Sequence, residues 1–216
     1  MTLIYHNGKF KDDGAVFAAD DRVRLGEAVF DVMPVVDGRP CYVVRHMEKL
    51  LRAGDVFFGA WERPSIDALE RAAFDLLDKN GFTAGRYSVR TLITRGPAGG
   101  GLRVPEQPAL QITMRAAVAP FEFPPIHAVI ARGVARNENS PLSQIKCANY
   151  GENILALREA TDQGASDAIM LNNAGHVACA TTSNIFVVRD GRLLTPPLSD
   201  GTQDGLTRRL VMEQHD

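Results

Sequence analysis

The segment Ser140-Pro141-Leu142-Ser143-Gln144-Ile145-Lys146-Cys147-Ala148-Asn149-Tyr150-Gly151-Glu152-Asn153 carries the strongest chemical signal in this chain. Lys146 stands in front of a helical pattern, and no carboxylate lies within three residues on either side of it. A lysine in this position can be partly desolvated, which disfavours the ammonium form, and a neutral amine condenses with an aldehyde to give a Schiff base. The alternative is a solvated surface lysine that precedes an ordinary helix.

Three further segments follow in order along the chain: Thr181-Thr182-Ser183-Asn184-Ile185-Phe186, Leu194-Thr195-Pro196-Pro197-Leu198-Ser199 and Gly205-Leu206-Thr207-Arg208. With the Lys146 segment, they resemble the fold-type IV pyridoxal-phosphate enzymes. That family includes branched-chain aminotransferases, D-amino-acid aminotransferases and aminodeoxychorismate lyases. Weaker similarities in the first hundred residues extend the resemblance over nearly the whole chain; they lie at Asn7-Gly8, Gly26 to Phe30, His46 to Leu50 and Thr94-Arg95-Gly96.

Length and composition are those of a globular enzyme. The chain has 216 residues, enough for one large or two small domains, with 45% hydrophobic and 23% charged residues. The formal net charge of -2 and the lack of a long basic run argue against a nucleic-acid or membrane partner. The polar start is not a signal peptide, so we expect a cytoplasmic protein. The spacing of Cys41, Cys147 and Cys179 fits neither a disulfide framework nor a metal site, so free thiols are expected.

Local patterns in the first half predict hairpins and two helices. Asn7-Gly8 supplies the positive φ angles of a tight turn. Residues 29–36 and 41–44 are predicted to pair as strands, with Pro34 indicating an edge or a bulge. Apolar residues at helical spacing predict helices over residues 45–58 and from residue 66, after Ser65 as the cap, to the stop at Asn80-Gly81.

A glycine-rich loop, Gly96-Pro97-Ala98-Gly99-Gly100-Gly101, lies between strands predicted at residues 87–95 and 109–115. It is not a phosphate-binding P-loop, because it lacks the lysine and hydroxyl residue and does not open a helix. We expect a mobile loop here, and the resemblance implies that it approaches the substrate.

The second half is predicted to alternate short strands, hairpins and helices. A strand at residues 128–130 precedes the Lys146 segment, from which a helix runs to about residue 163, and hairpins follow at residues 168–179 and 185–194. The fold class is therefore α+β, in the two-lobed architecture of fold type IV, with an N-terminal α/β lobe over residues 1–118 and a C-terminal cofactor-binding lobe over residues 119–216. Relatives continue beyond the end of this chain, so we expect a C-terminal lobe that is incomplete by comparison.

The resemblance implies a pyridoxal 5′-phosphate cofactor bonded to Lys146, whose freed amine would then move the substrate's α-proton. The other cofactor contacts that it implies are Lys49, Tyr150, Cys179, Thr181, Thr182, Ser183, Gln203, Leu206 and Thr207. A structural tyrosine and a plain Ser/Thr turn are the alternatives for Tyr150 and for residues 181–183.

A phosphate site at the helix start near Gly205 also follows from physical chemistry. The first amides of a helix lack intrahelical partners and, with the helix dipole, bind anions. Gly205 would allow close approach, and the Thr207 hydroxyl would add a donor. Asp204 is a competitor, because its carboxylate could cap the same amides. We expect Asp204 to turn away when cofactor is bound.

Three positions depart from the family pattern. Cys179 stands where a glutamate usually keeps the pyridine nitrogen protonated, and a thiol is a weaker donor. Lys49 stands in the place of an arginine and lacks its planar fork, with Arg45 and Arg52 as possible substitutes. Gln203 occupies a position that usually packs an apolar residue on the ring.

The leading hypothesis is therefore a class IV aminotransferase that moves an amino group between an amino acid and a 2-oxo acid. One alternative is a lyase of the aminodeoxychorismate type. The other is a degenerate member that keeps the fold as a binding or scaffold protein. The resemblance also implies a homodimer.

Overall fold

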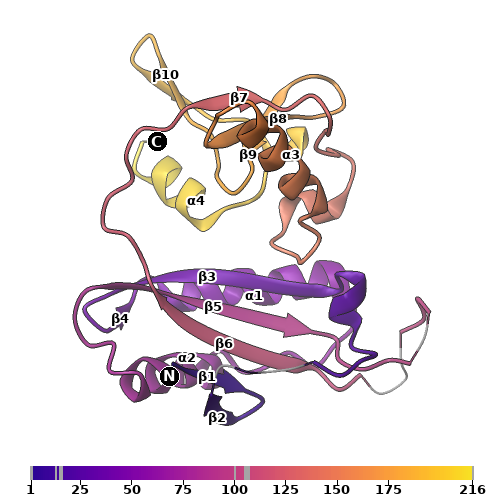
Figure 1. Ribbon diagram of the computed structural model, residues 1–216, viewed down its shortest axis with the longest axis vertical. Helices are drawn as coiled ribbons and strands as arrows, with labels where there is room; N and C mark the ends of the chain where they lie inside the picture. Colours follow the sequence, from indigo (N-terminus) through magenta and orange to yellow (C-terminus); the bar gives the residue numbers. More distant parts are fainter. Residues whose placement is uncertain (1, 13, 15–16, 100, 105–107, 216) are drawn as a thin grey trace. The chain divides into compact units, whose positions relative to one another are not determined.

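The computed structural model describes residues 2–12, 14, 17–99, 101–104 and 108–215, and it divides into two compact units (Figure 1). Unit 1 comprises Met1–Phe123 and unit 2 comprises Pro124–Asp216. The boundary predicted after residue 118 falls at the last residue of strand β6.

Unit 1 is built on a six-stranded antiparallel sheet with the strand order β2-β1-β6-β5-β3-β4. The strands are β1 (Leu3–His6), β2 (Lys9–Asp12), β3 (Ala28–Val36), β4 (Arg39–Pro40), β5 (Arg86–Thr94) and β6 (Gln111–Val118). The first strand pairs with β6, near the other end of the unit, in the register Ile4↔Arg115. Alternate residues of β5 and β6 are buried, so one face of the sheet forms the core.

Two amphipathic helices pack on this sheet. Helix α1 (Val43–Phe58) contacts β3, helix α2 (Ile66–Lys79) contacts β1 and β6, and the helices contact each other. Leu69, Leu76 and Leu77 are among the fully buried residues of the stripe predicted for α2. Ser65 is the N-cap residue of α2, but its side chain makes no capping hydrogen bond. Both predicted helices are confirmed.

The strand predicted at residues 41–44 is wrong. Pairing with β3 ends at Pro40. The Cys41 amide still donates to the Pro34 carbonyl, but Pro34 has no N–H to return the bond, and α1 begins at Val43. Tyr42, at the N-cap, has the left-handed φ of 50°, which turns the chain from strand into helix. The turn residues are as expected, because Asn7 and Asp37 have positive φ and each precedes a positive-φ glycine.

The described part of the glycine-rich loop is hydrogen-bonded to residues 20–22 instead of standing free. Asp20 accepts from the Gly99 amide at 3.1 Å, and the Arg22 guanidinium donates to the carbonyls of residues 101, 102 and 103. Gly96 has φ +84°, and a Cβ there would lie 1.9 Å from the Ala109 carbonyl oxygen, so glycine is required. Gly100 lies outside the described residues.

Unit 2 contains a three-stranded sheet, a separate hairpin and two helices. Its elements are β7 (Ala128–Ile130), α3 (Gly151–Asp162), β8 (Asp167–Leu171), β9 (Val177–Ala180), β10 (Val187–Arg189), β11 (Arg192–Leu194) and α4 (Leu206–Glu213). Strand β8 pairs in parallel with β7 and antiparallel with β9, and α3 packs on β8. The two predicted hairpins are therefore confirmed.

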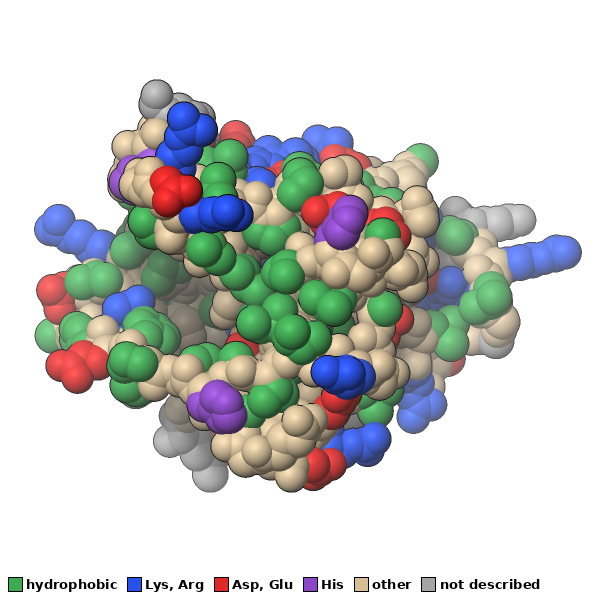
Figure 2. Space-filling view, turned by 90° about the horizontal axis from the view of Figure 1, so that it is seen from above, with side chains coloured by type: hydrophobic (Ala, Val, Ile, Leu, Met, Phe, Trp, Pro, Cys, Tyr) green, Lys and Arg blue, Asp and Glu red, His purple; other side chains and the backbone are tan. Residues whose placement is uncertain are grey.

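Figure 2 shows hydrophobic side chains gathered on the surface that is turned toward the reader. In unit 2, Val187 and Val188 of the β10–β11 hairpin are exposed. Among the described residues, no helix is both long and apolar enough to cross a membrane.

Candidate functional site

Lys146 follows a short 3-10 helix over Pro141–Gln144 and precedes α3. The turn begins because the Ser140 side chain accepts a hydrogen bond from the Leu142 amide at 3.3 Å and Pro141 fits its first position. Ile145 then leaves the turn in an extended conformation. Lys146 is half-buried, between the exposed Gln144 and the buried Cys147.

Hydrogen bonds connect the Lys146 segment to the residues that precede α4. The Asp204 amide donates to the Gln144 carbonyl at 3.1 Å, and the Gln144 side chain donates to the Leu198 carbonyl at 3.3 Å. The backbone segment that carries Lys146 and the segment that leads into α4 are therefore neighbours within unit 2.

The N-terminal end of α4 has no side-chain cap. Gly205 is the N-cap residue. Asp204 pairs with Arg209, whose Nε donates to Asp204 Oδ1 at 2.7 Å. This charge-assisted pair raises the pKa of Arg209. The competitor expected at this helix end is therefore turned away from the amides that it could have capped.

Asn184 packs against Gly205 and closes the turn before α4. Its amide donates to the Gln203 carbonyl at 2.8 Å and to the Thr202 hydroxyl at 3.3 Å. A Cβ added at Gly205 would lie 2.3 Å from Asn184 Oδ1, so a larger residue would have to displace the Asn184 side chain from its hydrogen bonds. The backbone at the start of α4 is thus held in place by a side chain from the Thr181–Asn184 turn.

The hydroxyls of the Thr181–Ser183 turn divide into two kinds. Thr181 is buried, and its hydroxyl donates to Asp167 at 2.5 Å, while the Asn153 amide donates to the Thr181 carbonyl at 2.6 Å. The hydroxyl therefore holds the turn against β8, and the carbonyl holds it against α3. Thr182 and Ser183 are exposed, so their hydroxyls stand at the surface of unit 2.

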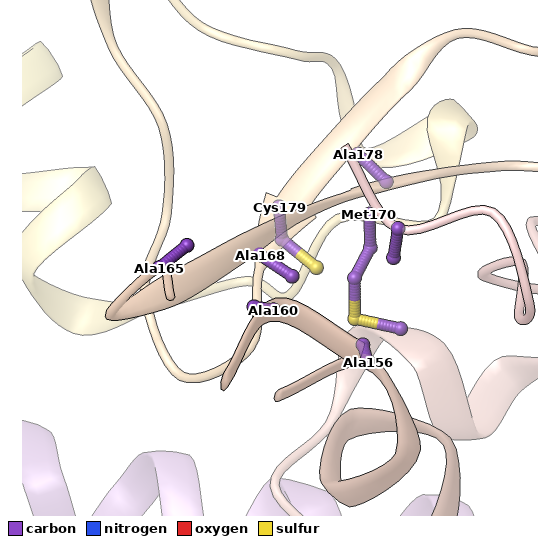
Figure 3. Packing of buried hydrophobic residues seen from close by; sticks show 8 residues of the cluster. Ala156, Ala160, Ala165, Ala168, Met170, Ala178 and Cys179 are labelled. Atoms are coloured by element: carbon purple, nitrogen blue, oxygen red, sulfur yellow. The ribbon is translucent and has the colours of Figure 1, made fainter. Parts of the chain in front are cut away.

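Cys179 lies in a small apolar cluster between the sheet and α3 (Figure 3). The cluster consists of Ala131, Ala156, Ala160, Ala165, Ala168, Met170, Ala178 and Cys179. Burial raises the pKa of the Cys179 thiol; the positive charge of Arg136 acts in the opposite direction and is the weaker effect. The thiol is therefore neutral at pH 7 and a poor substitute for the carboxylate that the family usually has here.

Lys49 belongs to a buried charge cluster in unit 1. Its ammonium lies 2.7 Å from Asp31 Oδ1, and His46 Nδ1 lies 2.5 Å from Asp31 Oδ2. Burial opposes ionisation of Asp31, but the His46 hydrogen bond and the Lys49 charge outweigh it and hold the pKa of Asp31 below its usual range. Of the substitutes considered for Lys49, Arg52 forms an exposed pair with Glu48.

The remaining predicted contacts lie in the same parts of unit 2. Tyr150 is the N-cap residue of α3 and is half-buried. Gln203 is half-buried in the turn before α4, Leu206 is buried in the first turn of that helix, and Thr207 is exposed. Lys49 alone lies in unit 1. Among the residues that the structure describes, no cluster of three or more histidines, cysteines or acidic residues could bind a metal ion.

Two residues with evident roles in this geometry had no assigned function in the sequence. Asn184 was visible only as part of the motif at residues 181–186, and Arg136, whose guanidinium donates to the Ser143 and Gly201 carbonyls, was not singled out. Both act on backbone carbonyls, and a carbonyl partner leaves no trace in residue type or spacing.

Comparison with known proteins identifies the family of this chain. The family model for class IV amino-transferases matches residues 28–216. The chain belongs to the class IV aminotransferase family. The predicted family, fold class and enzyme class are thereby confirmed.

Similar proteins cover nearly all of this class IV aminotransferase. D-alanine aminotransferase of Staphylococcus epidermidis is 25% identical over 98% of this chain and 74% of its own length. A crystal structure from Legionella pneumophila, named provisionally as a 4-amino-4-deoxychorismate lyase, is 28% identical with a TM-score of 0.86 and covers 94% of this chain and 74% of that one. Branched-chain aminotransferase of Escherichia coli, at 24% identity, has the same fold with a TM-score of 0.89, over 98% of this chain and 73% of that one. The chain thus spans about three quarters of these relatives' length.

Proposed function

We propose that this class IV aminotransferase uses pyridoxal 5′-phosphate and moves an amino group between an amino acid and a 2-oxo acid. The observation that carries the proposal is the hydrogen bond between the Asp204 amide and the Gln144 carbonyl. It joins the segment that carries a half-buried lysine to the segment that leads into an uncapped helix end. An aldehyde that bears a phosphate needs both an amine and a site for its phosphate.

The residues of unit 2 fit such a cofactor at its phosphate. The amides at the start of α4 and the Thr207 hydroxyl would donate to the phosphate oxygens, because Asp204 is engaged with Arg209. Gly205 lets the backbone approach closely. The fit is weaker at the ring nitrogen, where Cys179 offers a buried neutral thiol.

The chemistry divides between the cofactor and the chain. When bound, pyridoxal phosphate supplies the electron sink that stabilises negative charge at the substrate α-carbon. Lys146 Nζ would form the covalent bond to the cofactor aldehyde and, once displaced by the substrate amine, would take the proton from the substrate α-carbon. Thr181 would act indirectly, by holding the turn that bears Thr182 and Ser183.

The proposal is tested by titrating the purified protein with pyridoxal phosphate while recording its visible spectrum, and then assaying D-alanine and the branched-chain amino acids with 2-oxo acids. A new visible band and transfer of the amino group to the 2-oxo acid are expected. A spectrum identical to that of free cofactor would favour the scaffold alternative.

A lyase is the second candidate function, because the Legionella structure is among the similar proteins. The two activities differ in their need for a second substrate. A lyase would consume 4-amino-4-deoxychorismate without any 2-oxo acid, whereas an aminotransferase requires both partners.

Replacing Thr207 by valine should weaken cofactor binding. The change removes one hydrogen bond to a dianionic phosphate, which costs about 1.5 to 3 kcal/mol, or roughly ten- to a hundredfold in affinity. Equilibrium titration with pyridoxal phosphate measures the effect. Thr161→Val is the matched control, because that exposed threonine on α3 donates to the Leu157 carbonyl. Unchanged affinity for Thr207→Val would remove this helix end from the site.

Cys179→Glu tests whether residue 179 faces the ring nitrogen. Without cofactor, a carboxylate among alanines should lower the free energy of unfolding by about 2 kcal/mol. Cofactor should restore this loss and raise turnover if the carboxylate meets the pyridine nitrogen. Ala178→Glu, one residue earlier on the same buried strand, should be destabilised without such recovery. If the cofactor restored the stability of both variants equally, residue 179 would not be the one that faces the ring nitrogen.

We also propose a cytoplasmic homodimer, on the strength of the family resemblance. Light scattering coupled to size-exclusion chromatography would report twice the chain mass, and a monomer at micromolar concentration would contradict this proposal.

A further inference from the structure

Arg136 connects two segments of unit 2 that are far apart in the sequence. Its Nη2 donates to the Ser143 carbonyl at 2.5 Å, and its Nε donates to the Gly201 carbonyl at 3.2 Å. Ser143 lies in the 3-10 turn before Lys146, and Gly201 lies in the segment that leads into α4. One planar guanidinium therefore spans the two parts of the proposed cofactor site.

The backbone of Arg136 is itself fixed to the sheet. Its amide donates to the Leu171 carbonyl at 2.8 Å, and it forms a parallel bridge with Asn172 just beyond β8. The guanidinium is thus carried by the most regular part of unit 2. If the Ser143 or Gly201 carbonyl moved, its hydrogen bond to the Arg136 guanidinium would be strained.

Both acceptors are held closely. Gly201 has φ +79°, and a Cβ there would lie 3.0 Å from Glu138 Cα and 3.3 Å from Arg136 Cγ, so the chain passes too close for a side chain. Ser143 is buried, and its hydroxyl donates to the Asn137 carbonyl at 2.6 Å. The connection therefore has little freedom at either end.

Arg136 also lines an open cavity of about 350 Å³ beside the lysine segment. The other lining residues include Ser143, Cys147, Asn149 and Gly151, which flank Lys146 or begin α3. The guanidinium is thus next to the backbone that carries the lysine, and its bonds go to neutral carbonyls, which use its planar geometry as well as its charge.

We propose that Arg136 is a positioning residue that fixes the distance between Lys146 and the N-terminal end of α4. This inference rests on the proposed function, because the distance matters only if one cofactor must reach both places. A ligand held at its phosphate by α4 can bond to Lys146 only when the separation is right. A ligand that lacks the aldehyde needs the phosphate contacts alone.

The test compares two cofactor forms on Arg136→Lys, which keeps the charge but loses the planar fork. Pyridoxal phosphate can bond to Lys146, and pyridoxamine phosphate cannot. We expect the variant to lose about tenfold in affinity for pyridoxal phosphate, the effect of one charge-assisted hydrogen bond, and at most about twofold for pyridoxamine phosphate. The midpoint of the pH titration of the visible band should shift as well.

Two controls make the result specific. Arg132→Lys, at an exposed arginine on the same side of the Lys146 segment in sequence, should leave both affinities unchanged. In a Lys146→Ala background, Arg136→Lys should no longer distinguish the two cofactor forms. If Arg136→Lys does not fold, Gly201→Ala perturbs the same connection from its other end and should show the same discrimination.

Equal loss for both forms, or no loss for either, would overturn this inference and leave the proposed function standing. Failure of the wild-type protein to bind pyridoxal phosphate would overturn the proposed function and the role of Arg136 together.

Discussion

Lys146→Ala is expected to abolish transamination while leaving the fold intact. The substitution removes both the covalent partner of the cofactor aldehyde and the base that moves the α-proton. General acid–base catalysis alone contributes about a hundred- to ten-thousandfold in rate, so a loss of at least a thousandfold in kcat is expected. Lys146→Arg should be equally inactive, because a guanidinium neither condenses with an aldehyde nor gives up its proton near pH 7.

Chemical labelling identifies the lysine independently of turnover. Borohydride reduction of the wild-type protein with pyridoxal phosphate, followed by peptide mapping, should place the pyridoxyl group on Lys146. Lys11→Ala is the control, since Lys11 is an exposed residue of β2 and its loss should change neither labelling nor rate. Label on Lys49, or full activity in Lys146→Ala, would refute the assignment. Far-UV circular dichroism and the Tm show whether each variant is folded.

Asp31→Asn should cause a large loss of stability in unit 1. The side chains of Asp31, His46 and Lys49 are only 4%, 9% and 14% exposed. Removing the carboxylate leaves the Lys49 ammonium without its buried counter-charge. Breaking a buried pair in this way costs about 3 to 5 kcal/mol, and the partial exposure of Lys49 favours the lower value.

The effect of Asp31→Asn should depend on pH in a defined direction. Because the pKa of Asp31 is lowered in the folded state, its ionisation stabilises the fold above the unfolded-state pKa of about 4. That contribution is lost as the pH falls through the folded-state pKa. The difference in free energy of unfolding between wild type and Asp31→Asn should therefore be full at pH 7 and shrink in acid.

Denaturant unfolding at several pH values measures this difference. Glu48→Gln is the control, because it removes only the exposed pair of Glu48 with Arg52 on α1, the helix that carries Lys49. It should change the free energy of unfolding by less than about 1 kcal/mol. Asp31→Asn combined with Lys49→Met should recover part of the loss, because no unpaired charge then remains buried. A constant difference from pH 7 to pH 3 would show that Asp31 is not the ionised partner.

Features that depend on nearby residues were predictable from the sequence. Asn7-Gly8 and Asp190-Gly191 adopt the positive φ angles that tight hairpins need, and the apolar stripe of α2 faces the core. The start of α1 was missed because it depends on the left-handed conformation of Tyr42, a residue type that rarely adopts it.

The site was predictable only where residue types carry the chemistry. Lys146 and the uncapped helix end at Gly205 could be proposed from the sequence, and so could the competition from Asp204. The hydrogen bonds of Arg136 to two distant carbonyls and the pairing of Lys49 with Asp31 could not be predicted, because both depend on long-range packing that brings together groups from separate elements. The identity of Cys179 was plain, whereas its place among alanines required the structure.

The pairing of β1 with β6 has a consequence for how the chain acquires its fold. Strand β1 is made well before its partner, since Thr113 to Arg115 emerge from the ribosome only after most of unit 1. Closing so long a loop is slow, and until then β1 and β2 form a two-stranded hairpin, which is marginally stable in isolation. Until β6 arrives, the nascent chain exposes unpaired strand edges that other chains can bind, so chaperone protection should matter most during that interval.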